Sequence, residues 1–268
     1  MVKKILAKTY VYFILFLMYL PIFVLMIFSF TTSKNVGTWS GFSFDLYVNL
    51  FKNKAIMDAV GNTLLVAFCS AIVSTILGTL GAIGVFYSKK KAKNVLESIT
   101  QIPVVNAEIV MALSLAVLFV AIGWKRGFLT LLIGHVVLTI AFVYLSVKPK
   151  LTQMDPNTYE AALDLGATPR TALYKAVLPE IIPGIISGFM LALTLSLDDF
   201  IITAFTRNPG FDTLSTYVQG VIAKSSIPPE LRALTTIIFL VAVLILIFNS
   251  LRSKRENKNK HSLRREKF

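Results

Sequence analysis

The chain has 268 residues, of which 55% are hydrophobic and 15% are charged, and its mean hydropathy is +0.71. Soluble domains carry about 25% charged residues, so this composition argues against a soluble protein and indicates an integral membrane protein. The net charge is +13. Because the basic residues cluster at the ends of apolar runs, the charge indicates membrane orientation rather than nucleic-acid binding.

The first apolar run follows Lys3, Lys4 and Lys8 and ends near Phe30. A basic start before an apolar run is also typical of a secretory signal peptide. This run is too long for the apolar region of such a peptide, and no small-residue cleavage pattern follows it. We therefore predict an uncleaved first span.

Six apolar runs reach the length of about 20 residues that a membrane-spanning helix needs. The second and fifth exceed the bilayer thickness and are expected to tilt or protrude. The predicted fold is all-α, with one six-span domain over residues 1–252 and a basic tail over residues 253–268. The predicted spans are Tyr10–Phe30, Val60–Tyr87, Pro103–Ile122, Phe128–Val147, Ile181–Phe205 and Ala233–Leu251.

Lys and Arg are more frequent in the segments on the same side of the membrane as the N-terminus, and the basic tail supplies much of this excess. The positive-inside rule then predicts a multi-pass protein of a bacterial cell membrane with both termini in the cytoplasm. Two long outer connections, Thr31–Ala59 and Arg207–Arg232, each contain a short helical patch. They are either interfacial loops or a docking face for an extracellular partner.

The second predicted span contains Gly78, Gly81 and Gly84 at a spacing of three residues. Small residues on one helix face let two backbones approach closely in lipid, so we expect close packing there. Cys69 is the only cysteine and lies within an apolar run, so it supports neither a disulfide nor a metal site. His135 also lies within a predicted span, and we interpret it as a packing or hydrogen-bonding residue rather than a ligand.

A well-punctuated polar segment interrupts the apolar chain after the fourth predicted span. Asp155-Pro156 is a helix start signal, and Gly166 is a stop signal for a helix from Asn157 to Leu165. Thr168-Pro169 repeats the start signal for a second helix that runs to about Leu178. Neither helix is long enough to be stable alone in water, so the pair needs a partner surface or the lipid headgroups.

The stretch EAALDLGATPRTALYKAVLP resembles the EAA motif of ABC-importer permeases. The family's pattern is E-A-A, three residues, G, nine residues, I-x-L-P. Ala176 departs conservatively from the isoleucine position. The resemblance implies a type I importer permease with the MetI-like fold, in which residues 155–179 form cytoplasmic coupling helices. The matching positions are Glu160, Ala161, Ala162, Gly166, Leu178 and Pro179.

Much of the remaining chain is similar to the permease subunits of spermidine/putrescine importers, including IVMALSLAVLF, LTLSLDDFIITAF and the Pro228-Pro229-Glu230 loop. The resemblance implies a second permease subunit, a cytoplasmic ATPase dimer, an extracellular substrate-binding protein and a polyamine substrate. The chain has no Walker A pattern, so ATP and Mg would bind the ATPase, and we expect neither a cofactor nor a catalytic residue on this chain.

Three carboxylates fall within predicted spans that contain no Lys or Arg: Glu108, Asp198 and Asp199. A charge at mid-bilayer costs about 2.5–3.5 kcal/mol on insertion scales, so their presence needs an explanation. They are hydrated near the interface, or they pair with hydroxyls or with a partner subunit's cation, or they line a path for a cationic substrate. Adjacent helical residues point about 100° apart, so both aspartates are not expected to face one path.

The resemblance favours the third interpretation, because carboxylates suit the ammonium groups of a polyamine. We therefore predict a substrate path along Glu108 and one aspartate, with Asp198 preferred. Where the family has Pro-Asp, this chain has Ala107-Glu108, which keeps the charge on a longer side chain. Two alternatives are the same architecture with another cationic or small solute, and a stand-alone secondary transporter or membrane scaffold.

Overall fold

The computed structural model describes residues 2–33, 35, 37–155, 157–224, 227–245 and 247. These residues form helices and connections, and their one β-bridge, between Thr31 and Phe42, lies outside any strand. The predicted all-α fold is confirmed for this part of the chain. The chain divides into two compact units: unit 1 is Met1–Met57 with Val221–Phe268, and unit 2 is Asp58–Gly220.

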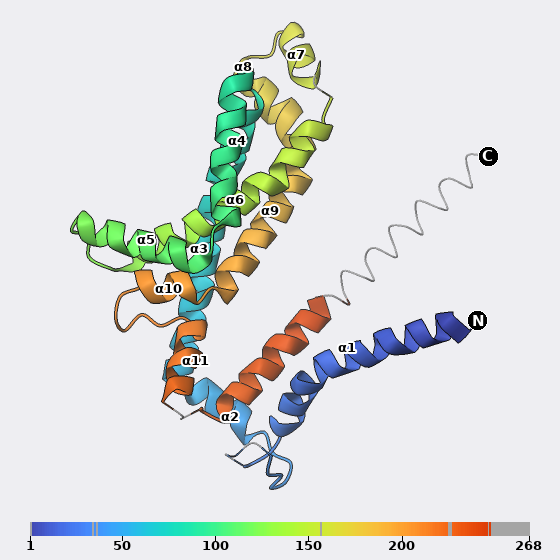
Figure 1. Ribbon diagram of the computed structural model, residues 1–268, viewed down its shortest axis with the longest axis vertical. Coiled ribbons are helices and arrows are strands. Elements are labelled where there is room, and N and C mark those ends of the chain that lie inside the picture. Colours follow the sequence, from blue (N-terminus) through green and yellow to red (C-terminus); the bar gives the residue numbers. More distant parts are fainter. Residues whose placement is uncertain are drawn as a thin grey trace. The chain divides into compact units, whose positions relative to one another are not determined.

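Unit 1 contains two helices that run antiparallel (Figure 1). They are α1, Val2–Phe28, and a helix over residues 230–245. The Phe239 ring centroid lies 6.5 Å from that of Tyr19, and Arg232 donates from Nη1 to the carbonyl of the last α1 residue at 3.3 Å. The second helix therefore starts beside the end of α1 and returns along it.

The two predicted outer connections each contain the expected short helix. α2, Asp45–Lys52, buries Leu46 and Leu50 and leaves Phe51 exposed, so it is amphipathic. α11, Leu214–Ala223, forms in the second connection. Both helices are too short to be stable alone, so packing of their apolar faces must hold them.

The central helix of unit 2 is α6, Phe128–Gln153 (Figure 1). It packs against α3, Lys54–Phe86, and most extensively against α9, Leu178–Asp198. Side chains of α6 that are fully buried between these neighbours include Val143, Val147 and Leu151. The buried core of unit 2 therefore lies along α6.

Glycines set the closest helix contacts in unit 2. A Cβ added at Gly78 of α3 would lie 2.8 Å from the Cβ of Val143 on α6, and one at Gly188 of α9 would lie 3.2 Å from the Val143 Cα. The predicted close packing is confirmed at Gly78. It is wrong for Gly81 and Gly84, where an added Cβ would meet nothing within 4 Å.

Four helices are long and apolar enough to cross a membrane in the described part of the chain: Lys8–Phe28, Lys54–Phe86, Phe128–Gln153 and Pro169–Asp198. A fifth candidate is the pair α4, Lys90–Val105, and α5, Glu108–Ala121, which are bent by 104° at a short break. In Figure 1, α5 accordingly runs across the direction of α3 and α9.

Two of the predicted spans have wrong bounds. Pro103–Ile122 crosses the bend between α4 and α5, where Asn106 and Ala107 are extended. Ile181–Phe205 crosses a break between α9 and α10 at Asp199, which is also extended. α10 is Ile201–Thr206.

The C-terminal predictions reach beyond the described residues. The predicted sixth span, Ala233–Leu251, is helical over residues 233–245 and at residue 247, and its other positions lie outside the described residues. The predicted basic tail, residues 253–268, lies outside them as well.

Candidate functional site

The start and stop signals of the EAA segment, residues 155–179, act as predicted. The Asp155 carboxylate accepts a hydrogen bond from the backbone N–H of Asn157 at 2.9 Å, and α7 runs over Asn157–Asp164. Pro156 lies outside the described residues. Thr168 caps α8, Pro169–Ala172, because its Oγ1 accepts from the N–H of Thr171 at 3.3 Å.

Gly166 ends α7 in the left-handed conformation, with φ +84°. Its N–H bonds to the Leu163 carbonyl at 2.8 Å, and the N–H of Ala167 bonds to the Ala162 carbonyl at 3.1 Å. This pair of bonds is the Schellman motif, which satisfies the last carbonyls of a helix. Gly166 therefore fixes the turn between the two short helices.

The second short helix does not end at Leu178, contrary to the prediction. α8 continues through a π turn, Leu173–Val177, directly into α9. A proline ring clashes with the carbonyl four residues earlier, which for Pro179 belongs to Lys175. Because Lys175 lies in the wider π turn, the helix can pass Pro179 without stopping.

The EAA segment presents a mixed polar and apolar surface. Glu160, Ala161, Gly166 and Pro179 are exposed, whereas Ala162 and Leu178 are half-buried. Two large apolar side chains of the same segment are also exposed, Leu165 at 90% and Tyr174 at 72%.

A pair of aromatic rings joins this segment to the end of α3. The ring centroid of Tyr159 on α7 lies 5.1 Å from that of Tyr87, and the Tyr87 centroid lies 5.0 Å from that of Phe86. Such pairs contribute about 0.5–1.5 kcal/mol beyond their buried area. The EAA segment is therefore packed against α3 as well as continuous with α9.

The predicted substrate-path residues lie at the two helix breaks. Glu108 is the first residue of α5, directly after the bend, and it is exposed. Asp198 is the last residue of α9 and is also exposed. Asp199 follows in the extended conformation and is only 6% exposed. The prediction that both aspartates lie in one continuous helix is therefore wrong.

The two helices that start at these breaks pack against each other. Met111 and Ala112 in the first turn of α5 share an apolar cluster with Ile202 of α10 and Leu138 of α6. Since α5 begins at Glu108 and α10 begins just after Asp199, this cluster brings the two breaks into the same region of unit 2.

A buried polar network surrounds Asp199, which the sequence did not predict. Its carboxylate accepts hydrogen bonds from the N–H groups of Ile202 and Thr203 and from the Thr203 hydroxyl. His135 of α6 lies 3.5 Å away, between Nε2 and Oδ2, and also bonds to Thr203 and to Ser196. The interpretation of His135 as a hydrogen-bonding residue is confirmed.

The sequence carried one signal for this network. His135 and Asp199 lie in neighbouring predicted spans, and neither span contains a Lys or Arg that could pair with the aspartate. No group of three or more His, Cys, Asp and Glu residues in the described part of the chain is arranged to hold a metal ion.

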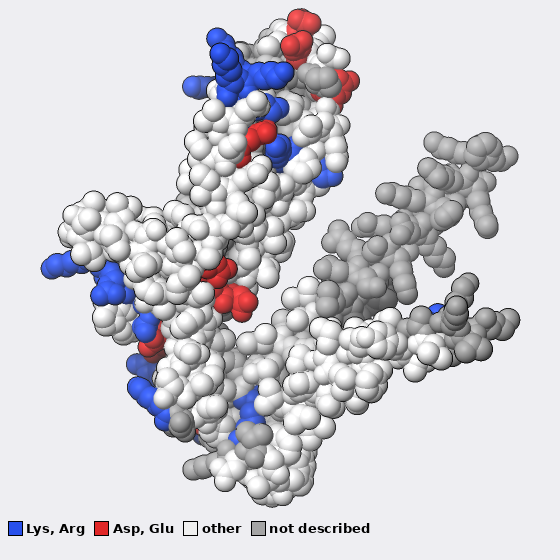
Figure 2. All heavy atoms as spheres, in the orientation of Figure 1, with Lys and Arg blue, Asp and Glu red and all other residues white. Residues whose placement is uncertain are grey.

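Charged side chains of unit 2 lie toward its two ends, and one group lies near α4 and α7. Figure 2 shows Lys and Arg where α4 begins, at Lys89, Lys90, Lys91 and Lys93, and Asp and Glu over the neighbouring α7. Between this end and the helix breaks the visible surface is almost uncharged. This pattern fits an apolar band between two charged ends.

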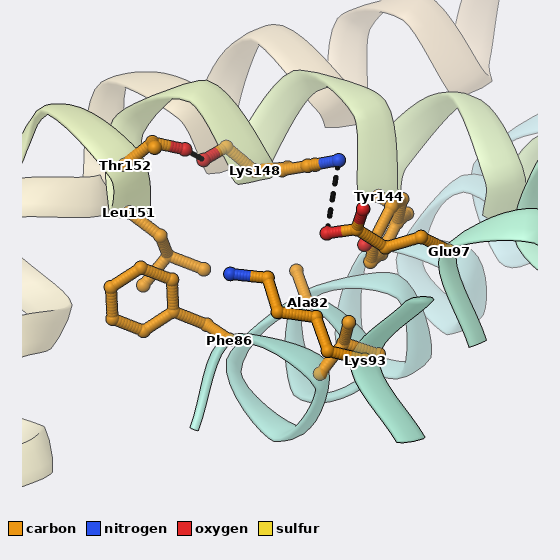
Figure 3. A pocket seen from close by; sticks show the side chains of 9 residues that line it. Ala82, Phe86, Lys93, Glu97, Tyr144, Lys148, Leu151 and Thr152 are labelled. Carbon is orange, nitrogen blue, oxygen red and sulfur yellow. Dashed lines mark hydrogen bonds and ion pairs between the residues drawn. The ribbon is translucent and has the colours of Figure 1, made fainter. Parts of the chain in front are cut away.

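A small pocket lies at the same end, between α3, α4 and α6 (Figure 3). Lys148 of α6 pairs with Glu97 of α4 at 3.0 Å, and the Lys93 ammonium lies 5.3 Å from the Phe86 ring centroid. The pocket contains none of the predicted path residues. The ion pair between Lys148 and Glu97 joins α4 to α6 and thereby holds α4 in place before its bend into α5.

The comparisons with known proteins agree with this geometry. The family model described as "Binding-protein-dependent transport system inner membrane component" matches residues 74–254. The chain is 40% identical over 228 residues to the putrescine transport system permease protein PotI of Escherichia coli strain K12, covering 82% of this chain and 81% of that protein. It is 32% identical over 240 residues to the spermidine/putrescine transport system permease protein PotC of Haemophilus influenzae, covering 90% and 93%.

Solved structures show the same fold at lower identity. A chain of the bacterial ABC transporter that imports the acidic polysaccharide alginate superposes with a TM-score of 0.73 at 20% identity, covering 95% of each chain. A chain of the MetNI methionine ABC transporter superposes with a TM-score of 0.53 at 18% identity, covering 73% of this chain and 93% of that chain. The protein therefore belongs to the family of binding-protein-dependent transport system inner membrane components and has the fold of ABC-importer permeases.

Proposed function

We propose that the protein is a permease subunit of an ABC importer for polyamines. The observation that carries this proposal is the 40% identity to a permease named for putrescine, over 82% of the chain. The relative at 32% identity is named for spermidine and putrescine, so putrescine is common to both names. Carboxylates at two helix breaks suit a substrate that carries ammonium groups.

Glu108 and Asp198 are the residues we propose for the substrate path. Both are exposed in the isolated chain and both lie where a membrane helix is interrupted. Interrupted helices in transporters expose backbone carbonyls and place them beside the substrate.

The EAA segment is the proposed contact with a cytoplasmic ATPase dimer of the PotA type. Glu160, Ala161, Ala162, Gly166, Leu178 and Pro179 would form or support that contact. Exposed Leu165 and Tyr174 support this proposal, because a solvated loop gains nothing from them. ATP and Mg would then bind the ATPase and not this chain.

The proposed assembly also contains a PotB-like second permease subunit, which completes the path, and a PotD-like extracellular binding protein, which delivers the polyamine. ATP binding would move the EAA segment and open the path outward, and hydrolysis would reset it. We propose that both termini lie in the cytoplasm. The basic cluster at the start of α4 supports this orientation, since it lies at the same end of unit 2 as α7.

The test is uptake of radiolabelled putrescine by the complete complex in proteoliposomes, with spermidine, lysine and choline as competitors. We expect saturable, ATP-dependent uptake that only polyamines inhibit. Glu108→Gln should lower uptake while the complex still assembles. Uptake inhibited equally by all amines would identify a general cation importer, and wild-type uptake by Glu108→Gln would exclude Glu108 from the path.

A further inference from the structure

The adjacent residues Asp198 and Asp199 lie in opposite environments. Asp198 ends α9 and is exposed, and its side chain makes no hydrogen bond or ion pair within the part of the chain that the structure describes. Asp199 is buried, with 6% of its surface exposed. Two carboxylates with such different surroundings cannot perform the same role in binding a cation.

The acceptor sites of Asp199 are occupied from within the chain. Oδ1 accepts from the N–H of Ile202 at 3.2 Å, and Oδ2 accepts from the N–H and the hydroxyl of Thr203, both at 2.8 Å. These N–H groups belong to the first turn of α10, where a negative charge is stabilised by the helix dipole. The Asp199 carboxylate therefore fixes the start of α10.

For a neutral His135 imidazole, the directions of the surrounding hydrogen bonds follow from the number of protons that each group can donate. A hydroxyl has one proton to donate, and that of Thr203 goes to Asp199, so Thr203 Oγ1 must accept from His135 Nε2 at 2.9 Å. In a neutral imidazole Nδ1 is then the acceptor, and it receives the proton of Ser196 Oγ at 2.7 Å. Ser196 Oγ in turn accepts from Ser70 at 2.9 Å, and Ser70 shares its proton with the Ala67 carbonyl at 3.1 Å.

These bonds form one chain that points toward Asp199 and joins four helices. Ser70 lies on α3, Ser196 on α9, His135 on α6 and Thr203 on α10, and all four are buried. Successive hydrogen bonds in one direction strengthen one another in a low-dielectric interior. The negative charge of Asp199 is the final acceptor, so it holds the α9–α10 break in place relative to α3 and α6.

We propose that Asp199 is a positioning residue of the transport path and that Asp198 is the only member of the pair that contacts the substrate. Asp199 acts through the backbone, since its bonds to α10 end α9 at Asp198 and leave that carboxylate exposed. This inference rests on the proposed function for the identity of the substrate. The role of the hydrogen-bond chain does not depend on it.

The first experiment measures the initial rate of putrescine uptake against concentration for the complete complex in proteoliposomes. Asp198→Asn should raise KM about tenfold, which corresponds to one lost charge contact, and leave the maximal rate within about twofold. Asp199→Asn should keep KM within about twofold, because the Asp199 side chain is turned toward α10 and does not meet the substrate, but it should lower the maximal rate, because an amide has only one oxygen to accept the bonds of Ile202 and Thr203. Asp199→Ala should lower the maximal rate. A KM for Asp199→Asn as high as that for Asp198→Asn would overturn the assignment.

The second experiment needs no substrate. Amide hydrogen exchange of the peptide covering residues 200–206, measured by mass spectrometry on the assembled complex, should be about tenfold faster in Asp199→Ala and unchanged in Asp198→Ala. Unchanged exchange in Asp199→Ala would refute the positioning role for any substrate. The two variants could show the predicted difference in exchange although the wild-type complex imports no putrescine. That result would support the positioning role and refute the proposed function.

Discussion

Replacing Gly166 tests whether the bend in the EAA segment transmits movement to this subunit. Gly166 has φ +84° and closes the Schellman motif at the end of α7. A Cβ added there would meet nothing within 4 Å. A substitution therefore changes the backbone preference at this position without creating a clash within the described part of this chain.

The free-energy cost of replacing Gly166 follows from its backbone conformation alone. A residue with a Cβ pays about 1–2 kcal/mol to adopt the left-handed conformation, and a β-branched residue pays more because its χ1 is restricted as well. Since 1.4 kcal/mol is a factor of ten in an equilibrium, Gly166→Val should reduce the population of the bent helix pair about tenfold or more. Asn visits this conformation more readily, so Gly166→Asn should cost much less.

The assay is ATP hydrolysis by the reconstituted complex, with and without the loaded binding protein. Stimulation by the loaded binding protein should fall in the order Gly, Asn, Ala, Val, while the amount of assembled complex stays constant. Equal stimulation in the Gly166→Val and wild-type complexes would refute the reasoning. Loss of assembly in Gly166→Val with normal stimulation of the remainder would show that the bend matters for docking alone.

Three further predictions concern contacts that hold the helices. Gly78→Ala should destabilise the permease by about 1–3 kcal/mol, because the new Cβ overlaps Val143, and Val143→Ala should relieve part of this loss. Thermal unfolding of the purified complex measures both, with Gly81→Ala as a neutral control. Tyr159→Ala should reduce substrate-stimulated ATP hydrolysis, and Tyr159→Phe should retain it, because the ring and not the hydroxyl contacts the end of α3. Thr168→Ala should cost about 1 kcal/mol at the start of α8, visible as faster amide exchange at Thr171.

The parts of the EAA segment that the sequence predicted correctly depend on local chemistry. The caps at Asp155 and Thr168 and the turn at Gly166 each involve residues within five positions of one another, so their signals are complete in the sequence. The same reasoning failed at Pro179. A proline normally ends a helix, but the π turn that lets the helix pass it is held by packing of Ala172 and Val177 inside unit 2.

The helix breaks were missed for a related reason. Long apolar stretches lie on both sides of Asn106 and of Asp199, so each run looks like one continuous span in the sequence. What ends α9 is a carboxylate whose partners include Thr203 and His135, and His135 is 64 positions away in the sequence. A contact of that kind exists only after α6 and α10 have packed together. The composition of a span can therefore predict its presence and depth, but not where it is interrupted.

The continuity of α8, the π turn and α9 gives the two proposed functional regions a direct physical connection. The helical run Pro169–Asp198 has 30 residues, which at about 1.5 Å per residue is roughly 45 Å long. The second half of the EAA segment forms the start of this run, and Asp198 is its last residue. Gly184 and Gly188 hold α9 close to α6 near its middle. In the proposed assembly, a force that tilts the EAA end of this run would therefore move the opposite end in the other direction. Asp198 would then move against the network that anchors Asp199 next to it. We therefore expect the peptide between the two aspartates to convert the tilt of α9 into a change of the proposed substrate path.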